Sequence, residues 1–123
     1  MSRSRQTRQA ARQRGRAAET LCVWWLRLKG YRIIGRDLRT PVGEIDILAR
    51  RGGTLAVIEV KARATQDDAG AAILPAQQRR IARALDWVVQ RRGDLQALSP
   101  RFDAMLIGGG RLPRHLMDAW RIE

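Results

Sequence analysis

The chain has 123 residues, which is enough for one hydrophobic core and excludes a large multi-domain enzyme. Its 24 basic residues outnumber 12 acidic ones, giving a net charge of +12, and all the basic residues except Lys29 and Lys61 are arginine. Arginine suits paired hydrogen bonding to phosphate, so we expect a polyanionic partner; a coding bias toward arginine is the alternative. The single cysteine, Cys22, excludes an internal disulfide and a cysteine-based zinc site.

The N-terminal residues bear on the compartment and on the domain boundary. Residues 1–14 contain five arginines and no acid, and they lack the apolar core of a secretion signal. We therefore expect a cytoplasmic protein, with an organelle transit peptide as the alternative. The same composition predicts a disordered arm, which either improves solubility or contacts phosphate. No apolar run reaches the roughly 18 residues of a membrane span, so no membrane partner is expected.

In chain order, hydrophobic periodicity and turn residues predict two helices and four or five strands. The first helix is predicted over 16–29, where apolar residues share one stripe and Gly30 provides a stop. The second opens near Pro75, a favourable first-turn residue. The predicted strands are 31–38, 44–49, 55–62, 102–107 and, more weakly, 112–122. The order α-β-β-β-α-β predicts a mixed α/β domain over 15–123, with helices flanking one sheet.

The hairpin formed by the second and third strands brings charged residues together. With Gly52-Gly53 as the two central turn residues, Asp46 lies opposite Glu59 and Glu44 lies opposite Lys61. Because side chains alternate along a strand, all four project from one face of the hairpin. Opposed carboxylates repel, and the apolar residues around Glu59 limit the access of water.

Three remedies for the repulsion are a raised pKa, a neighbouring cation and a bound metal ion. Lys61 is a partial remedy, and Mg²⁺ is a fuller one because it binds carboxylates together with water and phosphate oxygens. Lys61 could then orient a water or stabilise charge on a phosphate. In the alternative interpretation, Glu44 and Lys61 form a surface salt bridge while Asp46 and Glu59 face solvent.

Asp46 followed by Glu59-Val60-Lys61, in a hairpin after an N-terminal helix, resembles the PD-(D/E)XK nuclease superfamily with its restriction-endonuclease-like core. More closely, the chain resembles the YraN-like family of small bacterial endonuclease-like proteins, over about residues 15–120. The matching stretches are GRAAE (15–19), GY (30–31), GEIDILA (43–49), IEVKAR (58–63) and RFD (101–103). The spacing of GEIDILA and IEVKAR is specific, whereas GRAAE alone is a weak signal.

The resemblance implies that Asp46 and Glu59 bind the metal, Mg²⁺ or Mn²⁺, with the Val60 carbonyl as a third ligand. It assigns Lys61 as the motif lysine and Glu19 as the helix glutamate that completes such sites. Glu19 lies on the apolar stripe of its helix, where an unpaired acid is costly, so the alternative is an ion pair with an arginine. Relatives commonly have a lysine in the first turn of the second helix, where this chain has Gln77.

Other residues give weaker signals. The arginines expected to contact nucleic acid are Arg63, Arg79, Arg80 and Arg83. Trp24 and Trp25 are adjacent, so at most one faces the core, and the other packs at an edge, on the N-terminal arm, on a partner subunit or on a base. Trp87 lies on the arginine-rich side of the second helix, where packing at the helix edge is the favoured interpretation. His115 is expected at the surface, because no residue with ligand spacing accompanies it. The 108–110 triglycine is expected to be a plain turn.

Three functions follow from these patterns. The first is a metal-dependent endonuclease acting on nucleic acid, with DNA the favoured substrate. Small nucleases often use two copies to cut both strands, so a homodimer is one expected assembly. The second is a protein that binds nucleic acid on a nuclease-like scaffold without cleaving it. The third is an interaction protein unrelated to nucleic acid, whose charge reflects coding bias. The carboxylates favour the first function over the second, because a simple binder gains nothing from acids facing phosphates.

Overall fold

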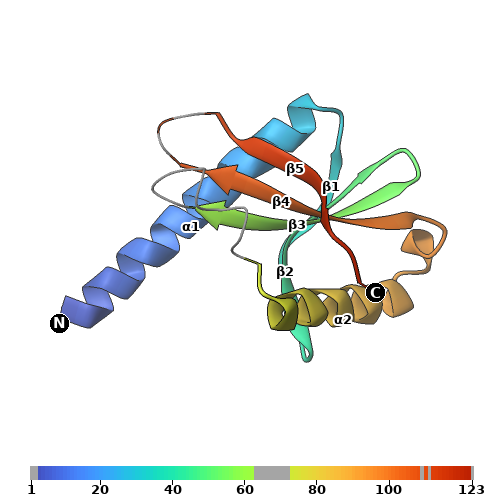
Figure 1. The fold of residues 1–123 in the computed structure, drawn as a ribbon, viewed down its shortest axis with the longest axis horizontal. Helices are drawn as coiled ribbons and strands as arrows, with labels where there is room; N and C mark the ends of the chain where they lie inside the picture. The colour runs from blue at the N-terminus through green and yellow to red at the C-terminus, as the bar shows by residue number, and fades with distance from the viewer. Residues whose placement is uncertain (1–2, 63–72, 109, 111, 123) are drawn as a thin grey trace.

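A computed structural model describes residues 3–62, 73–108, 110 and 112–122 (Figure 1). The α-β-β-β-α-β order is confirmed, and the weakly predicted last strand is present. The elements are α1 (Arg3–Leu28), β1 (Arg32–Thr40), β2 (Gly43–Arg51), β3 (Thr54–Ala62), α2 (Pro75–Arg91), a 3₁₀ turn (Gly93–Leu95), β4 (Ser99–Ile107) and β5 (Arg114–Trp120). Residues 63–72, which include Arg63, lie outside the described residues. None of the described helices is long and apolar enough to cross a membrane.

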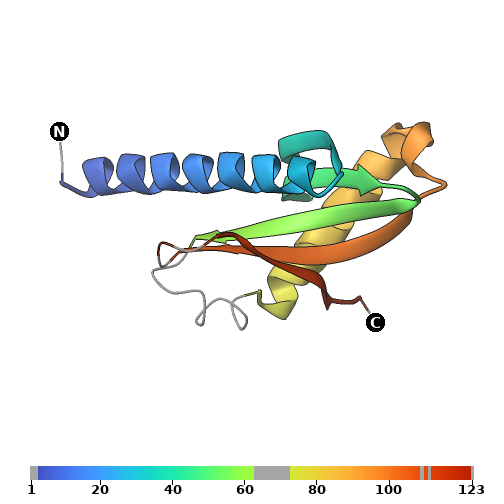
Figure 2. The ribbon, with the colours of Figure 1, turned by 90° about the horizontal axis from the view of Figure 1, so that it is seen from above.

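The five strands form one mixed sheet in the order β1-β2-β3-β4-β5. Neighbouring strands are antiparallel except β3 and β4, which run parallel from the pair Thr54–Ser99 to the pair Ala62–Ile107. A parallel pair requires a crossover connection, and α2 lies within it. The strands separate α1 from α2, so each helix covers one face of the sheet (Figures 1 and 2).

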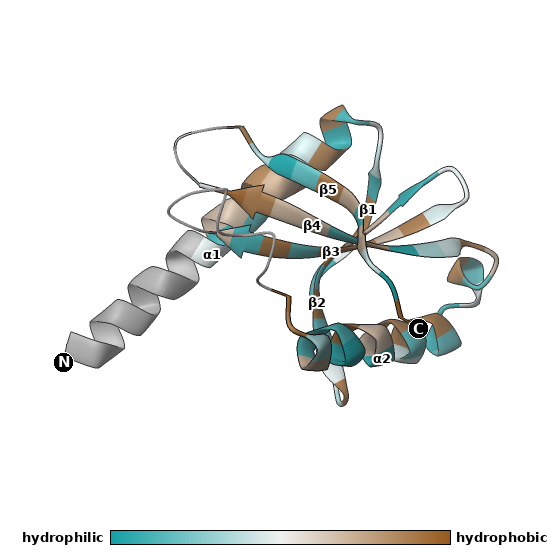
Figure 3. Ribbon diagram, in the orientation of Figure 1, coloured by the Kyte–Doolittle hydropathy of each residue, from teal (hydrophilic) through white to brown (hydrophobic). Residues whose placement is uncertain are grey.

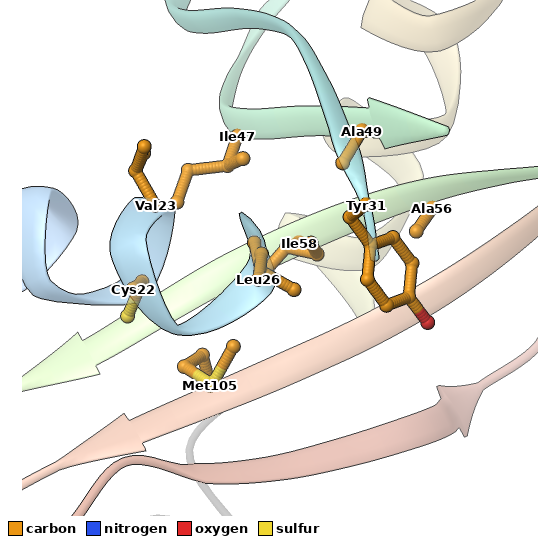
Figure 4. Packing of buried hydrophobic residues seen from close by; sticks show 9 residues of the cluster. All are labelled: Cys22, Val23, Leu26, Tyr31, Ile47, Ala49, Ala56, Ile58 and Met105. Atoms are coloured by element: carbon orange, nitrogen blue, oxygen red, sulfur yellow. The ribbon is translucent and has the colours of Figure 1, made fainter. Parts of the chain in front are cut away.

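The first core cluster lies between α1 and the sheet. Its helix residues, Cys22, Val23 and Leu26, pack against strand residues that include Ile58 and Met105 (Figure 4). Gly30 adopts a left-handed φ of 89°, and the Tyr31 amide donates to the Leu26 carbonyl at 3.0 Å, which ends the helix as predicted.

The helix begins earlier than the sequence predicted. The backbone of residues 3–14 is helical and continuous with the rest of α1, where a disordered arm was expected. The prediction weighed the lack of apolar side chains, but alanine, arginine and glutamine are all strong helix formers. Continuation from an anchored helix also avoids a new nucleation step, so the segment does not need a core of its own to be helical.

The second core cluster lies between α2 and the opposite face of the sheet. Pro75 occupies the first turn as predicted, and Ile81, Ala84 and Leu85 are the buried helix residues. The turn between β1 and β2 lies directly against this helix: a Cβ atom at Gly43 would overlap the Arg80 carbonyl oxygen. Glycine at this position therefore allows the β1–β2 turn to lie beside the N-terminal half of α2.

The predicted hairpin register is confirmed for part of its length. Pairs run from Arg51–Thr54 at the turn to Ile47–Ile58, and beyond that point β2 continues to pair with β1 alone. Asp46 is the first residue past the end of this ladder. Ile45 packs on the α2 side and Ile47 on the α1 side, although a regular strand would place both on one face. The strands β2 and β3 therefore separate at Asp46, and the predicted ladder pairs Asp46–Glu59 and Glu44–Lys61 do not form.

Candidate metal centre

Four acidic residues gather where β2 and β3 separate. Asp46 comes from β2, Glu59 from β3, Glu19 from α1 and Asp37 from β1. One carboxylate oxygen from each of Glu19, Asp37 and Asp46 lies within 4.8 Å of the other two. The structure thus brings the three acids predicted from the sequence into one region and adds Asp37.

Beyond Ile58, the backbone of β3 no longer pairs with that of β2, and the Asp46 side chain accepts a hydrogen bond from β3 instead. The Val60 amide donates a hydrogen bond to Asp46 Oδ2 at 2.9 Å, where a regular hairpin would use a backbone carbonyl. This bond fixes the Asp46 carboxylate beside the EVK segment. Val60 lines the same cavity as Asp46 and Glu59, which is compatible with the predicted use of its carbonyl as a ligand.

Glu59 and Lys61 project together toward the first turn of α2. Lys61 Nζ lies 3.6 Å from Glu59 Oε1, and the Gln77 amide donates to the same oxygen at 2.7 Å. Lys61 Nζ also donates to Gln77 Oε1 at 3.5 Å. Lys61 therefore pairs with Glu59 on its own strand, and the alternative Glu44–Lys61 bridge is not among the described ion pairs.

The environment of Glu19, Asp46 and Glu59 opposes their ionisation. Burial, reinforced by the charge of Asp46, raises the pKa of Glu59 from 4.5 to about 7 despite the nearby Lys61 ammonium. Burial also raises the pKa of Asp46, although the Val60 amide acts in the opposite direction. The site thus holds more negative charge than its protein neighbours compensate.

Glu19 has both predicted features: it lies in the acidic site, and it forms an ion pair with an arginine. It is 6 % exposed, and its Oε1 accepts from Arg36 Nε at 3.1 Å, which is the predicted ion pair with an arginine. Burial and contact with Asp37 nevertheless raise the pKa of Glu19 from 4.5 to about 7, because Arg36 offsets them only in part. Arg36 is exposed to solvent, and its ion pair with Glu19 does not move the Glu19 carboxylate away from those of Asp37 and Asp46.

Asp37 was not among the predicted site residues, because the prediction did not use the pairing of the first two strands. The β1–β2 ladder pairs Arg36 with Ile47 and Leu38 with Ile45, so Asp37 lies across from Asp46. Its φ of 50° is left-handed, a conformation that aspartate tolerates better than most residues. A two-residue Pro41-Val42 connection between Thr40 and Gly43 fixes this register and is the signal that could have identified Asp37.

Two cavities flank the acids. A cavity of about 320 Å³ lies toward α2 and includes Gln77 and Arg80 in its lining. A second, of about 460 Å³, lies toward α1 and includes Arg16 and Arg39. Asp46 and Glu59 line both cavities, so the carboxylates separate two spaces that each have arginine at the wall. Such walls suit a phosphate group next to a carboxylate-bound cation.

The predicted nucleic-acid arginines are divided among different positions. Arg80 lines the cavity on the α2 side, and Arg79 and Arg83 are exposed on the same helix. Arg63 lies outside the described residues. In Figure 3 the first turns of α2 are hydrophilic, which agrees with this placement.

A second group of buried polar residues lies around Asp103, in the RFD stretch. Asp103 is fully buried and accepts two hydrogen bonds from Arg101, both at 2.8 Å. His115 Nε2 lies 2.8 Å from Asp103 Oδ2, and the Asp118 amide donates to Oδ1 at 2.9 Å. The side chain of His115 is only 2 % exposed, so the prediction of a surface histidine is wrong: Asp103 and Lys29 provide polar partners inside the fold.

The fold and the site define a small α/β protein with a restriction-endonuclease-like core and a carboxylate cluster where its central hairpin opens. The chain belongs to the uncharacterised protein family UPF0102, whose family model matches residues 18–107. This confirms the YraN-like resemblance seen in the sequence.

Three relatives illustrate the similarity to this family, and each is a UPF0102 protein. The chain is 54 % identical to one from Parvibaculum lavamentivorans over 91 % of this chain and 84 % of the relative. It is 47 % identical to one from Paramagnetospirillum magneticum over 94 % and 92 %, respectively. The third, from Caulobacter vibrioides, is 50 % identical over 90 % and 89 %. The names of these relatives state no activity.

Proposed function

We propose that the protein is a Mg²⁺- or Mn²⁺-dependent nuclease that hydrolyses phosphodiester bonds, with DNA as the favoured substrate. The observation that carries the proposal is the cluster of Glu19, Asp37 and Asp46, from three elements, with carboxylate oxygens within 4.8 Å of one another. Glu59 adjoins it with a pKa raised to about 7. Perturbed carboxylates in arginine-lined cavities are typical of catalytic sites.

The chemistry of the donor set fits a hard divalent cation. Asp46 and Glu59 would hold the ion with the Val60 carbonyl, and Glu19 and Asp37 offer further carboxylate oxygens beside Asp46. A bound ion would supply positive charge that favours the ionised form of Glu19, Asp46 and Glu59 and polarises a phosphate oxygen. The residues available for this role are all oxygen donors, as magnesium and manganese prefer.

The remaining site residues would position the substrate. Arg80 at one cavity, and Arg16 and Arg39 at the other, can hold phosphate groups on either side of the carboxylates. Lys61, 3.6 Å from Glu59, can orient a water or stabilise charge on the phosphate under attack. Gln77 holds Glu59 in place through its 2.7 Å hydrogen bond.

Binding without hydrolysis is the second candidate, and one observation favours it. Arg36 already compensates part of the charge of Glu19, as a purely structural acid would require. A non-catalytic binder should bind nucleic acid more tightly after Asp46→Asn, because a negative charge facing phosphate is removed. A metal-dependent nuclease should instead lose metal binding and cleavage.

Calorimetric titration with Mg²⁺ and Mn²⁺ tests the proposal directly. The native protein should release or absorb heat with a saturable profile, and Asp46→Asn should lose most of it. Asp94→Asn is the matched control, because Asp94 is an exposed acid paired with Arg92. Equal heats in the native protein and Asp46→Asn would refute the metal site.

Cleavage assays on labelled DNA and RNA complete the test. We expect cleavage that requires the metal and is abolished in Asp46→Asn but retained in Asp94→Asn. The cytoplasmic location and the homodimer expected from the sequence belong to the same proposal. Light scattering with and without nucleic acid measures whether two copies assemble.

A further inference from the structure

We infer that the flank of α2 next to the acidic site is a subsite for unpaired nucleotides, built from Arg80, Trp87 and Arg91. The inference rests on the proposed function and narrows its substrate to nucleic acid with a single-stranded segment beside the cleaved bond. The three side chains lie within about 40° of one another around the helix axis, at about 100° per residue. They therefore form a row along one side of α2.

The row begins at the acidic site. Arg80 lines the cavity that also contains Asp46 and Glu59. From Arg80 to Arg91 the helix rises about 16 Å at 1.5 Å per residue. That length corresponds to about five stacked nucleotides at 3.4 Å per step. The row is therefore long enough for about five nucleotides of a strand whose phosphate lies at Arg80.

Trp87 and Arg91 form a stacked pair at the far end of this row. The guanidinium carbon of Arg91 lies 3.8 Å from the centre of the Trp87 ring, and Arg91 Nη1 donates to the Trp87 carbonyl at 2.9 Å. Trp87 is half-buried but is not among the described residues of the core cluster beneath α2. Because the Arg91 guanidinium covers one face of the Trp87 ring, a base would stack on the outer side of this guanidinium or on ring surface beyond it.

The charge of the flank selects an anionic ligand. The exposed Arg79 and Arg83 lie on the same helix, and Asp86, the one acid in its sequence, is about 100° from Trp87 around the axis. Alternating cations and aromatic surface suit a strand that carries phosphates and bases together.

The flat surface of Trp87 and Arg91 should bind unpaired nucleic acid in preference to paired nucleic acid. In a duplex the faces of the bases are stacked on one another, and only their edges and the phosphates are accessible. In a single strand the faces are available to stack on aromatic rings or on guanidinium planes. Trp87 and Arg91 therefore contribute to single-strand affinity, whereas the arginines alone serve a duplex equally well.

Fluorescence anisotropy in EDTA tests the subsite without hydrolysis, using a labelled single strand and a blunt duplex of the same sequence. Trp87→Ala should weaken single-strand binding by about 5- to 160-fold, the range expected for loss of one stacked base, and change duplex binding by less than about twofold. Trp87→Phe keeps a ring and should stay close to the native affinity. Arg91→Lys keeps the charge but loses the flat guanidinium, so single-strand binding should weaken selectively.

The matched control is Trp24→Ala. Trp24 is 59 % exposed on α1, across the sheet from α2, and has its own stacked cation in Arg27 at 5.4 Å. This variant should bind both ligands as the native protein does. Quenching of tryptophan fluorescence by the single strand should also shrink in Trp87→Phe, where Trp24, Trp25 and Trp120 remain.

An unchanged single-strand affinity in Trp87→Ala overturns the subsite, and so does an equal loss for strand and duplex. A loss of the same size in Trp24→Ala overturns it as well. Selective loss in Trp87→Ala together with no metal-dependent cleavage of any substrate supports the subsite and refutes the nuclease. The two proposals therefore fail separately.

Discussion

Asp103 and Asp46 are both acids on central strands of one sheet, yet their surroundings differ in kind. Asp103 receives hydrogen bonds from Arg101, His115 and the Asp118 amide, and although burial acts to raise its pKa, these partners lower it overall. Asp46 has one backbone donor and lies among other carboxylates, and burial raises its pKa. The fold provides hydrogen-bond partners that compensate the charge of Asp103, but it does not provide enough of them to compensate the charge of Asp46.

The difference teaches how to distinguish a structural acid from a functional one. A buried charge whose partners are all present adds rigidity and needs no ligand. A group of acids that the protein leaves under-compensated costs stability, and it is retained where another component completes it. The two acids should therefore respond in opposite ways to the same perturbation.

Asp103→Ala should produce the largest effect. Removing this acid leaves Arg101, His115 and the Asp118 amide without their shared acceptor, and the free energy of unfolding should fall by about 3–5 kcal/mol. Urea denaturation measures the change, with the exposed Asp94→Ala as the control. A loss as small as that of the control would remove the contrast between the two acids.

Asp46→Asn should change the free energy of unfolding in the opposite direction to Asp103→Ala. Without metal at pH 7.5, replacing this under-compensated acid should increase the free energy of unfolding by about 1–3 kcal/mol, because an amide needs no counter-ion. Its oxygen can still accept from the Val60 amide. The same urea experiment measures the gain, and a loss comparable to that of Asp103→Ala would contradict our account of the site.

The free energy of unfolding should depend on pH in opposite directions for the acidic site and for Asp103. Glu19 and Glu59 have a pKa of about 7 in the fold against 4.5, so between these values the folded state binds more protons than the unfolded chain. The free energy of unfolding should therefore fall by about 1–3 kcal/mol as pH rises from 4.5 to 7.5. The contribution of Asp103, whose pKa is lowered, is present above its ordinary 3.8 and is lost as pH falls below it.

Thermal unfolding across this range, with and without Mg²⁺, measures the effect. Under the proposed function, added Mg²⁺ should restore stability near pH 7.5, because it binds the ionised acids of the folded state. A metal-free protein whose stability rises from pH 5 to 7.5 would show that the acids are already compensated.

Gln77→Lys should have the smallest effect. A cation in place of the amide that contacts Glu59 should lower the pKa of Glu59 and reduce the fall in stability above pH 5 by less than about 1 kcal/mol. Gln78→Lys is the matched control, since Gln78 donates to the Ile73 carbonyl and not to the acids. Identical pH profiles for the two variants would exclude an influence of Gln77 on the site.

The sequence predicted the parts of the fold that depend on local pattern. Alternation and the Gly52-Gly53 turn determine the β2–β3 register as far as Ile47, and the apolar stripe determines the face of α1 that carries Glu19. The separation of the strands at Asp46 could not be predicted from this hairpin alone, because it follows from the continued pairing of β2 with β1.

The polar interior was predicted less well than the hairpin. His115 gave no local signal because its partners, Asp103 and Lys29, are separated from it by 12 and 86 positions along the chain. Such contacts arise only when β5 pairs with β4 near the end of α1. Asp37 could have been found from the β1–β2 register, but its membership in the acidic cluster also depends on the approach of Glu19 from α1.

The amide of Val60 has a consequence for spectroscopy. It donates to a carboxylate oxygen of Asp46 instead of a backbone carbonyl, so its proton resonance responds to the charge on that side chain. Titrating acid or a divalent ion while following this one nitrogen–hydrogen pair by NMR would report on the acidic cluster from inside the sheet. The backbone of β3 thus carries a natural sensor next to the chemistry it supports.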